Sequence, residues 1–62
     1  MFKFFDDYFH NPLVVKQEDV VGVRNDNKTA GCVIILLSSG HTVQVQGTLF
    51  EVINELGLET EN

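Results

Sequence analysis

Residues 32–48 read CVIILLSSGHTVQVQGT, a stretch without a single charged side chain. The apolar run 32–37 is followed by Ser-Ser-Gly and then by a strict alternation that places Val43 and Val45 on one face and glutamines on the other. This order predicts an antiparallel hairpin whose turn has Gly40 at a positive φ. Because a strand that is apolar on both faces is covered on both faces, we expect the domain core on one side and a second covering element or molecule on the other.

The segment that follows the hairpin, residues 48–57, predicts a capped α-helix. Thr48 and Glu51 match the T-x-x-E capping box, in which each side chain accepts a hydrogen bond from a free backbone N–H. Gly57 suits the left-handed position after the helix, and Leu58 can then fold back onto Ile53. The apolar face of this helix consists of Leu49, Val52, Ile53 and Leu56. We expect this face to pack on the core, with Phe50 outside it.

The first twelve residues hold five of the six aromatic side chains. One helical face would carry Met1, Phe2, Phe5, Tyr8 and Phe9. We interpret this spacing as an N-terminal helix over residues 1–11, which ends before Pro12 because the residue that precedes a proline is driven out of the helical region. A first β-strand over residues 2–5 is the alternative.

Two β-branched runs, 13–16 and 20–24, lie between the aromatic segment and the hairpin. Gly22 indicates a bulge in the second run, and 25–31 has the composition of a loop. A chain of 62 residues has room for one domain only. The predicted architecture is a single α+β domain over residues 1–62, with a small antiparallel, SH3-like β-sheet of three or four strands (13–46), an N-terminal aromatic helix (1–11), a C-terminal capped helix (48–57) and a tail (58–62).

The charge balance argues against anionic partners. Nine acidic and four basic residues give a net charge of −5, and no Lys or Arg follows Lys28. Nucleic-acid binding depends on clustered basic side chains that neutralise phosphates, and binding to anionic membrane surfaces depends on them as well. The sequence also lacks a signal-peptide pattern and an apolar run of the roughly 20 residues that span a bilayer. We therefore expect a cytoplasmic protein without a membrane or nucleic-acid partner.

No pattern of side chains points to catalysis. The candidates are Cys32, His10 and His41, but Cys32 precedes a buried strand and has no basic neighbour to stabilise a thiolate. The spacing of the three residues also lacks the close pairs typical of a structural metal site, and the glycines form no phosphate-binding fingerprint. We expect a protein that is not an enzyme, with no metal, no cofactor and a reduced, buried thiol.

The small size of the chain favours self-association. A domain of this length buries a small core, and one cysteine provides no internal disulfide to supplement it. The uncharged hairpin also lacks the lysine, proline or inward charge that normally protects a sheet edge. We predict a non-catalytic interaction or regulatory module, bacterial or phage-encoded, that forms a homo-oligomer, most simply a dimer, and also binds another protein. The predicted partner-binding residues are Phe4, His41, Thr42, Gln44, Gln46 and Phe50.

A second hypothesis follows from the acidic residues. The chain would then be an acidic inhibitor or nucleic-acid mimic that binds a basic surface of a target enzyme. Its binding face would consist of Asp6, Asp7, Glu18, Asp19, Glu51, Glu55, Glu59 and Glu61.

Residues 13–56 resemble the small flagellar and swarming-motility protein family. The stretches VVKQEDVVGV and VIILLSSGHTVQVQGTLFEVINEL are similar to its strand, its I-x-L-x-x-G-x-x-x-x-V hairpin and its E-V-x-x-x-L closing helix. The matching residues are Ile35, Leu37, Gly40, Val45, Glu51, Val52 and Leu56. Because all of them are structural, the resemblance implies a fold more than a function. The same order of hairpin and helix is similar to part of the LytTR-type DNA-binding domain and to small phage and bacterial accessory proteins, although this chain lacks the basic residues that DNA reading requires.

Overall fold

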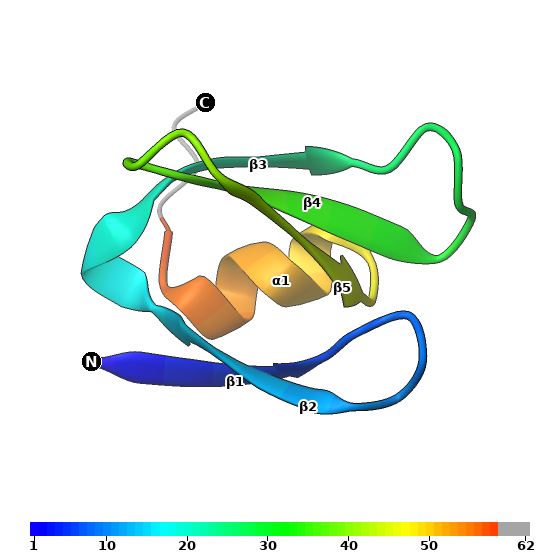
Figure 1. Cartoon of the computed structure of the whole chain (residues 1–62), viewed down its shortest axis with the longest axis horizontal. Coiled ribbons are helices and arrows are strands. Elements are labelled where there is room, and N and C mark those ends of the chain that lie inside the picture. The colour runs from blue at the N-terminus through cyan, green and yellow to red at the C-terminus, as the bar shows by residue number, and fades with distance from the viewer. Residues whose placement is uncertain (59–62) are drawn as a thin grey trace.

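The computed structural model describes residues 1–58, which form two antiparallel sheets and one α-helix. The elements are β1 (Phe2–Asp6), β2 (Pro12–Lys16), the 3₁₀ helix η1 (Gln17–Asp19), β3 (Val20–Asn25), β4 (Cys32–Leu37), β5 (Thr42–Gln46) and α1 (Leu49–Leu56). One sheet pairs β1 with β2, and the other has the order β3-β4-β5. Figure 1 shows α1 between the two sheets. The predicted antiparallel pairing is therefore confirmed, and the elements fit the predicted α+β class. The prediction of a single sheet of three or four strands over residues 13–46 is wrong, because five strands form two sheets.

β4 and β5 form the predicted hairpin. Val33 lies opposite Val45 and Ile35 lies opposite Val43, so the aliphatic side chains of both strands share one face. Gly40 occupies the turn with φ 92°, a conformation that a residue with a Cβ rarely adopts. The register of the hairpin thus follows from its alternation and its turn, as expected from the sequence.

β3 joins the other side of β4 through a bulge. The register shifts between Val20 and Gly22, which confirms the irregularity that Gly22 indicated. A Cβ added at Gly22 would lie 3.4 Å from Leu36 Cδ1, so the absence of a side chain lets Leu36 lie close to the backbone of β3.

The core forms where both sheets meet α1. Its buried side chains are Val15, Val33, Ile35, Val45, Val52 and Leu56. β2, β4, β5 and α1 therefore all contribute to it. Phe5 of β1 and Leu13 of β2 pack against this cluster, which attaches the two-stranded sheet to the rest of the domain.

α1 is capped at both ends as predicted. Thr48 Oγ1 accepts a hydrogen bond from the Glu51 N–H at 3.2 Å, and Glu51 Oε1 accepts one from the Thr48 N–H at 2.9 Å. Gly57 adopts the left-handed conformation with φ 71°, and the Leu58 N–H donates to the Ile53 carbonyl at 3.1 Å. No helix among residues 1–58 has the length and apolar composition needed to cross a membrane.

The predicted start of the C-terminal tail, at residue 58, is too early in the chain. Leu58 packs against the core, because closure of the helix at Gly57 turns the chain back onto α1. The rest of the predicted tail, residues 59–62, lies outside the described residues.

The predicted N-terminal helix over residues 1–11 is wrong. Residues 2–6 form β1 instead, so the sheets begin at Phe2 rather than at residue 13. Apolar residues are so frequent in this segment that they fit a period of two as well as a period of 3.6. The strand is favoured because it hydrogen-bonds along the whole of β2 and also places Phe5 against the core. A helix would leave the backbone groups of β2 without that partner.

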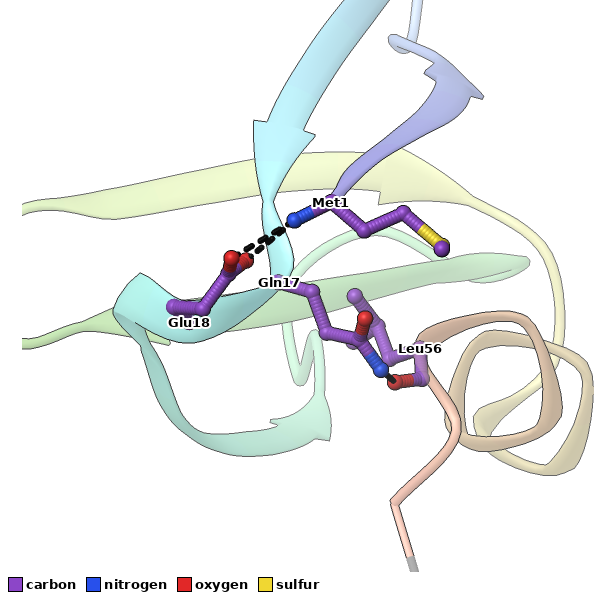
Figure 2. Close-up of polar contacts among 4 residues, drawn as sticks. All are labelled: Met1, Gln17, Glu18 and Leu56. Carbon is purple, nitrogen blue, oxygen red and sulfur yellow. Dashed lines mark hydrogen bonds and ion pairs between the residues drawn. The ribbon is translucent and has the colours of Figure 1, made fainter.

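η1 connects the two sheets and contacts the end of α1 (Figure 2). The side-chain amide of Gln17 donates a hydrogen bond to the Leu56 carbonyl. The Glu18 carboxylate accepts hydrogen bonds from the N-terminal ammonium of Met1 at 2.7 and 2.6 Å. These contacts hold the C-terminal end of α1 and the start of β1 at the corner between β2 and β3.

Candidate interaction surface

The face of the β1–β2 sheet that points away from the core is apolar. Phe4 lies directly opposite Val14, and Phe2 precedes it on the same face. The three residues are 62% (Phe2), 71% (Phe4) and 52% (Val14) exposed, and we call them the outer hairpin surface. Six of the eight large apolar residues that are exposed in the described chain lie within residues 1–14. Contiguous exposed apolar residues of this kind mark interaction sites.

Asp7 builds the turn that sets the register of this surface. Its carboxylate accepts hydrogen bonds from the Phe9 N–H at 2.8 Å and from the Asn11 N–H at 2.9 Å. His10 completes the turn with φ 66°, a conformation in which histidine is enriched among non-glycine residues. Tyr8 and Phe9 remain exposed, with their ring centroids 5.2 Å apart in an edge-to-face arrangement. The turn therefore adds two more aromatic rings next to the strands.

Thr42, Gln44 and Gln46 share the outer face of β5, as predicted from the alternation. Gln44 Nε2 donates a hydrogen bond to Asp26 Oδ2 at 2.6 Å. Gln46 Nε2 donates to two backbone carbonyls of the β1–β2 turn at 2.8 and 3.2 Å. Both glutamine side chains are thus engaged within the chain, whereas Thr42 is exposed.

The other three predicted partner-binding residues lie on separate elements. His41 is in the β4–β5 turn, where its Nδ1 lies 3.0 Å from Ser39 Oγ. Phe4 is on β1, and Phe50 is on α1 with 77% of its surface exposed. The structure therefore brings three of the six residues onto one strand and distributes the rest.

Side chains of the two neighbouring strands partly cover the apolar residues of β4 on the outer face of the three-stranded sheet. Ile34 and Leu36 point to this face and are half-buried. Arg24 and Gln44 lie on either side of Ile34 in the register, and Leu36 lies over Gly22. The second cover that the sequence predicted for β4 thus comes in part from neighbouring strands, and some apolar area stays accessible.

Half of the described carboxylates in the predicted acidic face stabilise the fold itself. Asp7 holds the β1–β2 turn, Glu18 pairs with the N-terminal ammonium and Glu51 caps α1. The ammonium hydrogen bond lowers the pKa of Glu18, and the hydrogen bonds from Thr48 lower the pKa of Glu51. The predicted Glu59 and Glu61 lie outside the described residues. The acidic-inhibitor hypothesis therefore has few free carboxylates among residues 1–58.

Cys32 is a packed thiol, with 5% of its surface exposed. It borders an open hollow of ≈ 550 Å³ that Tyr8, Phe9 and His10 also line. Among residues 1–58, no group of three His, Cys, Asp or Glu side chains could hold a metal ion. The hollow combines the aromatic rings of Tyr8 and Phe9, which suit contact with apolar groups, with the amide of Gln46, which suits hydrogen bonding.

Phe2 and Val14 are not among the predicted partner-binding residues. The predicted helix places Phe2 on its apolar face, and the β-branched run 13–16 predicts a strand without indicating which face Val14 occupies. The alternation of Phe2, Lys3, Phe4 and Phe5 contains the signal, because a strand with Phe5 inside must have Phe2 and Phe4 outside.

Comparison with protein-family models, with curated proteins and with solved structures finds no match to the chain. Function is therefore inferred from the surfaces described above.

Proposed function

We propose that the chain is a non-catalytic, cytoplasmic protein-interaction module, bacterial or phage-encoded, that works as a homodimer. The two sheets and α1 serve as an SH3-like scaffold, and the outer hairpin surface is the contact between the two copies. The observation that carries this proposal is the exposure of Phe2, Phe4 and Val14 side by side on a strand pair whose other face is in the core.

The apolar area at this face supplies the driving force. Full burial of one large apolar side chain contributes about 1.5–3 kcal/mol, and Phe4 retains most of that potential because it is 71% exposed. A standard interface buries about 800 Å² on each partner. The neighbouring exposed residues Met1, Tyr8 and Phe9 extend the apolar area available beside the outer hairpin surface.

Charge at the two ends of the surface favours a second copy as the partner. Lys16 lies beside Phe2 at one end and Asp6 lies beside Pro12 at the other, and both charges are exposed on the same face. In a dimer with two-fold symmetry, the same patch meets itself in the opposite direction. With the two-fold axis running across the strands, the Lys16 end of each copy lies over the Asp6 end of the other, so these charges attract although each chain carries a net charge of −5.

The test is a measurement of mass by size-exclusion chromatography with light scattering across a dilution series. Phe4→Ser is expected to give a folded monomer. Phe50→Ser is the matched control, because Phe50 is similarly exposed, at 77%, but lies on α1, and it should leave the dimer intact. A wild-type chain that stays monomeric at every concentration, or equal effects of the two variants, would contradict the proposal.

A charge exchange tests the symmetry. Asp6→Lys or Lys16→Glu alone places like charges together and should weaken the dimer about three- to thirtyfold. The double variant restores opposite charges across the two-fold axis and should recover most of the affinity. If the double variant loses as much dimerisation free energy as the two single variants lose together, Asp6 and Lys16 do not face each other in the dimer.

A further inference from the structure

The four sheet edges differ in their protection against strand pairing. The edge at β2 carries Pro12 and Lys16, and the edge at β3 contains the bulge at Gly22. Prolines, lysines and bulges at an edge all discourage the addition of another strand. β1 has the charged Asp6 at its end. β5 has no proline, no bulge and no charged residue.

The backbone of β5 offers hydrogen-bonding groups along its outer edge. The Leu37 N–H donates to the His41 carbonyl at 3.0 Å, and the Gly47 N–H donates to the Gly31 carbonyl at 2.9 Å. Along an antiparallel strand, the backbone N–H and C=O groups of successive residues point alternately to one side of the strand and to the other. The backbone groups of the odd-numbered residues of β5 therefore bond to β4. Those of the even-numbered residues point to the outer edge of the sheet. Within residues 1–58, no backbone or side-chain group bonds to the main chain of Thr42 or Gln44 on that side.

In Figure 1 α1 lies between the three-stranded sheet and the β1–β2 sheet, and β5 is in contact with β1. A hollow of ≈ 290 Å³ there is lined by Phe4, Phe5, Asp6, Pro12 and Gln46. A second hollow of ≈ 150 Å³ beside it reaches Glu51 and Glu55 of α1. The two hollows thus combine the apolar side chains of Phe4, Phe5 and Pro12 with three carboxylates, those of Asp6, Glu51 and Glu55.

We propose that β5 accepts an extended segment of a different protein as an added strand, and that this segment carries Lys or Arg close to an aliphatic side chain. The main chain of the segment bonds to Thr42 and Gln44, which is the mode of recognition known as β-augmentation. Its aliphatic side chain enters the hollow at Phe5, and its cation lies near Glu55.

Charge identifies the occupant as a different protein rather than a second copy. The hairpin that a second copy would present, residues 32–46, contains no charged residue, and no Lys or Arg follows Lys28. A second copy that pairs through the same hairpin therefore brings no cation to Glu51 and Glu55, whereas a segment that contains Lys or Arg complements them. Phe4 lines both hollows and also belongs to the outer hairpin surface, so the two sites share this residue. Thr42 and Glu55 lie outside the outer hairpin surface, and their variants therefore test this site independently of the dimer.

The probe is a random octapeptide library displayed on phage and panned against the full chain. Enriched peptides should alternate β-branched residues with others and contain Lys or Arg, and a synthetic copy of one should shift the amide NMR signals of Thr42 and Gln44. Recovery of no peptide, or of peptides without basic residues, would overturn the proposal. Shifts of the same amides that depend on protein concentration alone would assign the edge to a second copy and overturn the choice of occupant.

Matched variants locate the contact. Thr42→Pro removes the outward N–H without touching the bonds to β4 and should weaken the selected peptide about three- to tenfold, whereas Thr42→Val keeps the N–H and should bind like wild type. Glu55→Lys should weaken it about two- to fivefold, while Asp19→Lys makes the same change in net charge on η1 and should have no effect. Equal affinities within either pair would refute the assigned geometry.

Discussion

Replacement of Gly57 with alanine is expected to destabilise the protein through two separate effects. The first is conformational, because Gly57 has φ 71° and a residue with a Cβ loses about 1–2 kcal/mol in the left-handed region. The second is local, because the new Cβ would lie 2.9 Å from Gln17 Nε2. Gln17 must then move and give up its hydrogen bond to the Leu56 carbonyl, which contributes about 1 kcal/mol.

A double-mutant cycle separates the two effects. Gln17→Ala alone should lower the free energy of unfolding by about 1 kcal/mol, and Gly57→Ala alone by about 2–3 kcal/mol. In the double variant the hydrogen bond is lost only once, so the total should stay near 2–3 kcal/mol and the coupling near 1 kcal/mol. Gly40→Ala is the control, because Gly40 also has a positive φ but its added Cβ would meet nothing within 4 Å.

The assay is urea unfolding followed by far-ultraviolet circular dichroism, with all variants at one protein concentration because the chain is proposed to dimerise. Gly40→Ala should combine additively with Gln17→Ala. Additive costs for Gly57→Ala and Gln17→Ala would refute the claim that Gln17 holds the end of α1 through this contact.

Three further results are expected. The pKa of Glu51 is lowered from its ordinary 4.5 by hydrogen bonds from the backbone and hydroxyl of Thr48. The contribution of this carboxylate to stability is present above pH 4.5 and is lost as the pH falls through the folded-state pKa. The difference in melting temperature between wild type and Glu51→Gln should therefore shrink between pH 7 and pH 3. Ile35→Val, at a fully buried site, should cost about 0.5–1.5 kcal/mol in urea unfolding, and Ile34→Val on the half-buried outer face should cost clearly less. The Cys32 thiol should react with a disulfide reagent only as fast as the protein opens, and a rapid reaction of the native protein would contradict its burial.

Parts of the fold were readable from short stretches of sequence because their causes are local. The capping box, the apolar face of α1 and the glycine after it act within a few residues of one another, and each was predicted and found. The same holds for the alternation and turn of the β4–β5 hairpin. Four of the predicted partner-binding residues, Phe4, His41, Thr42 and Phe50, are exposed, and their role in binding stays a prediction.

Other features depended on partners far apart in the chain. The N-terminal segment fits a helix or a strand by its own pattern, and the choice was made by pairing with residues 12–16 and by the position of Phe5 against the core. The hydrogen bonds that engage Gln44 and Gln46 link residues 18 and 39 positions apart. The sequence by itself thus determined the hairpin, the helix and its caps, while the tertiary structure alone decided which face of β1 is exposed and which sheet edge is open, because both depend on contacts between segments that no local pattern specifies.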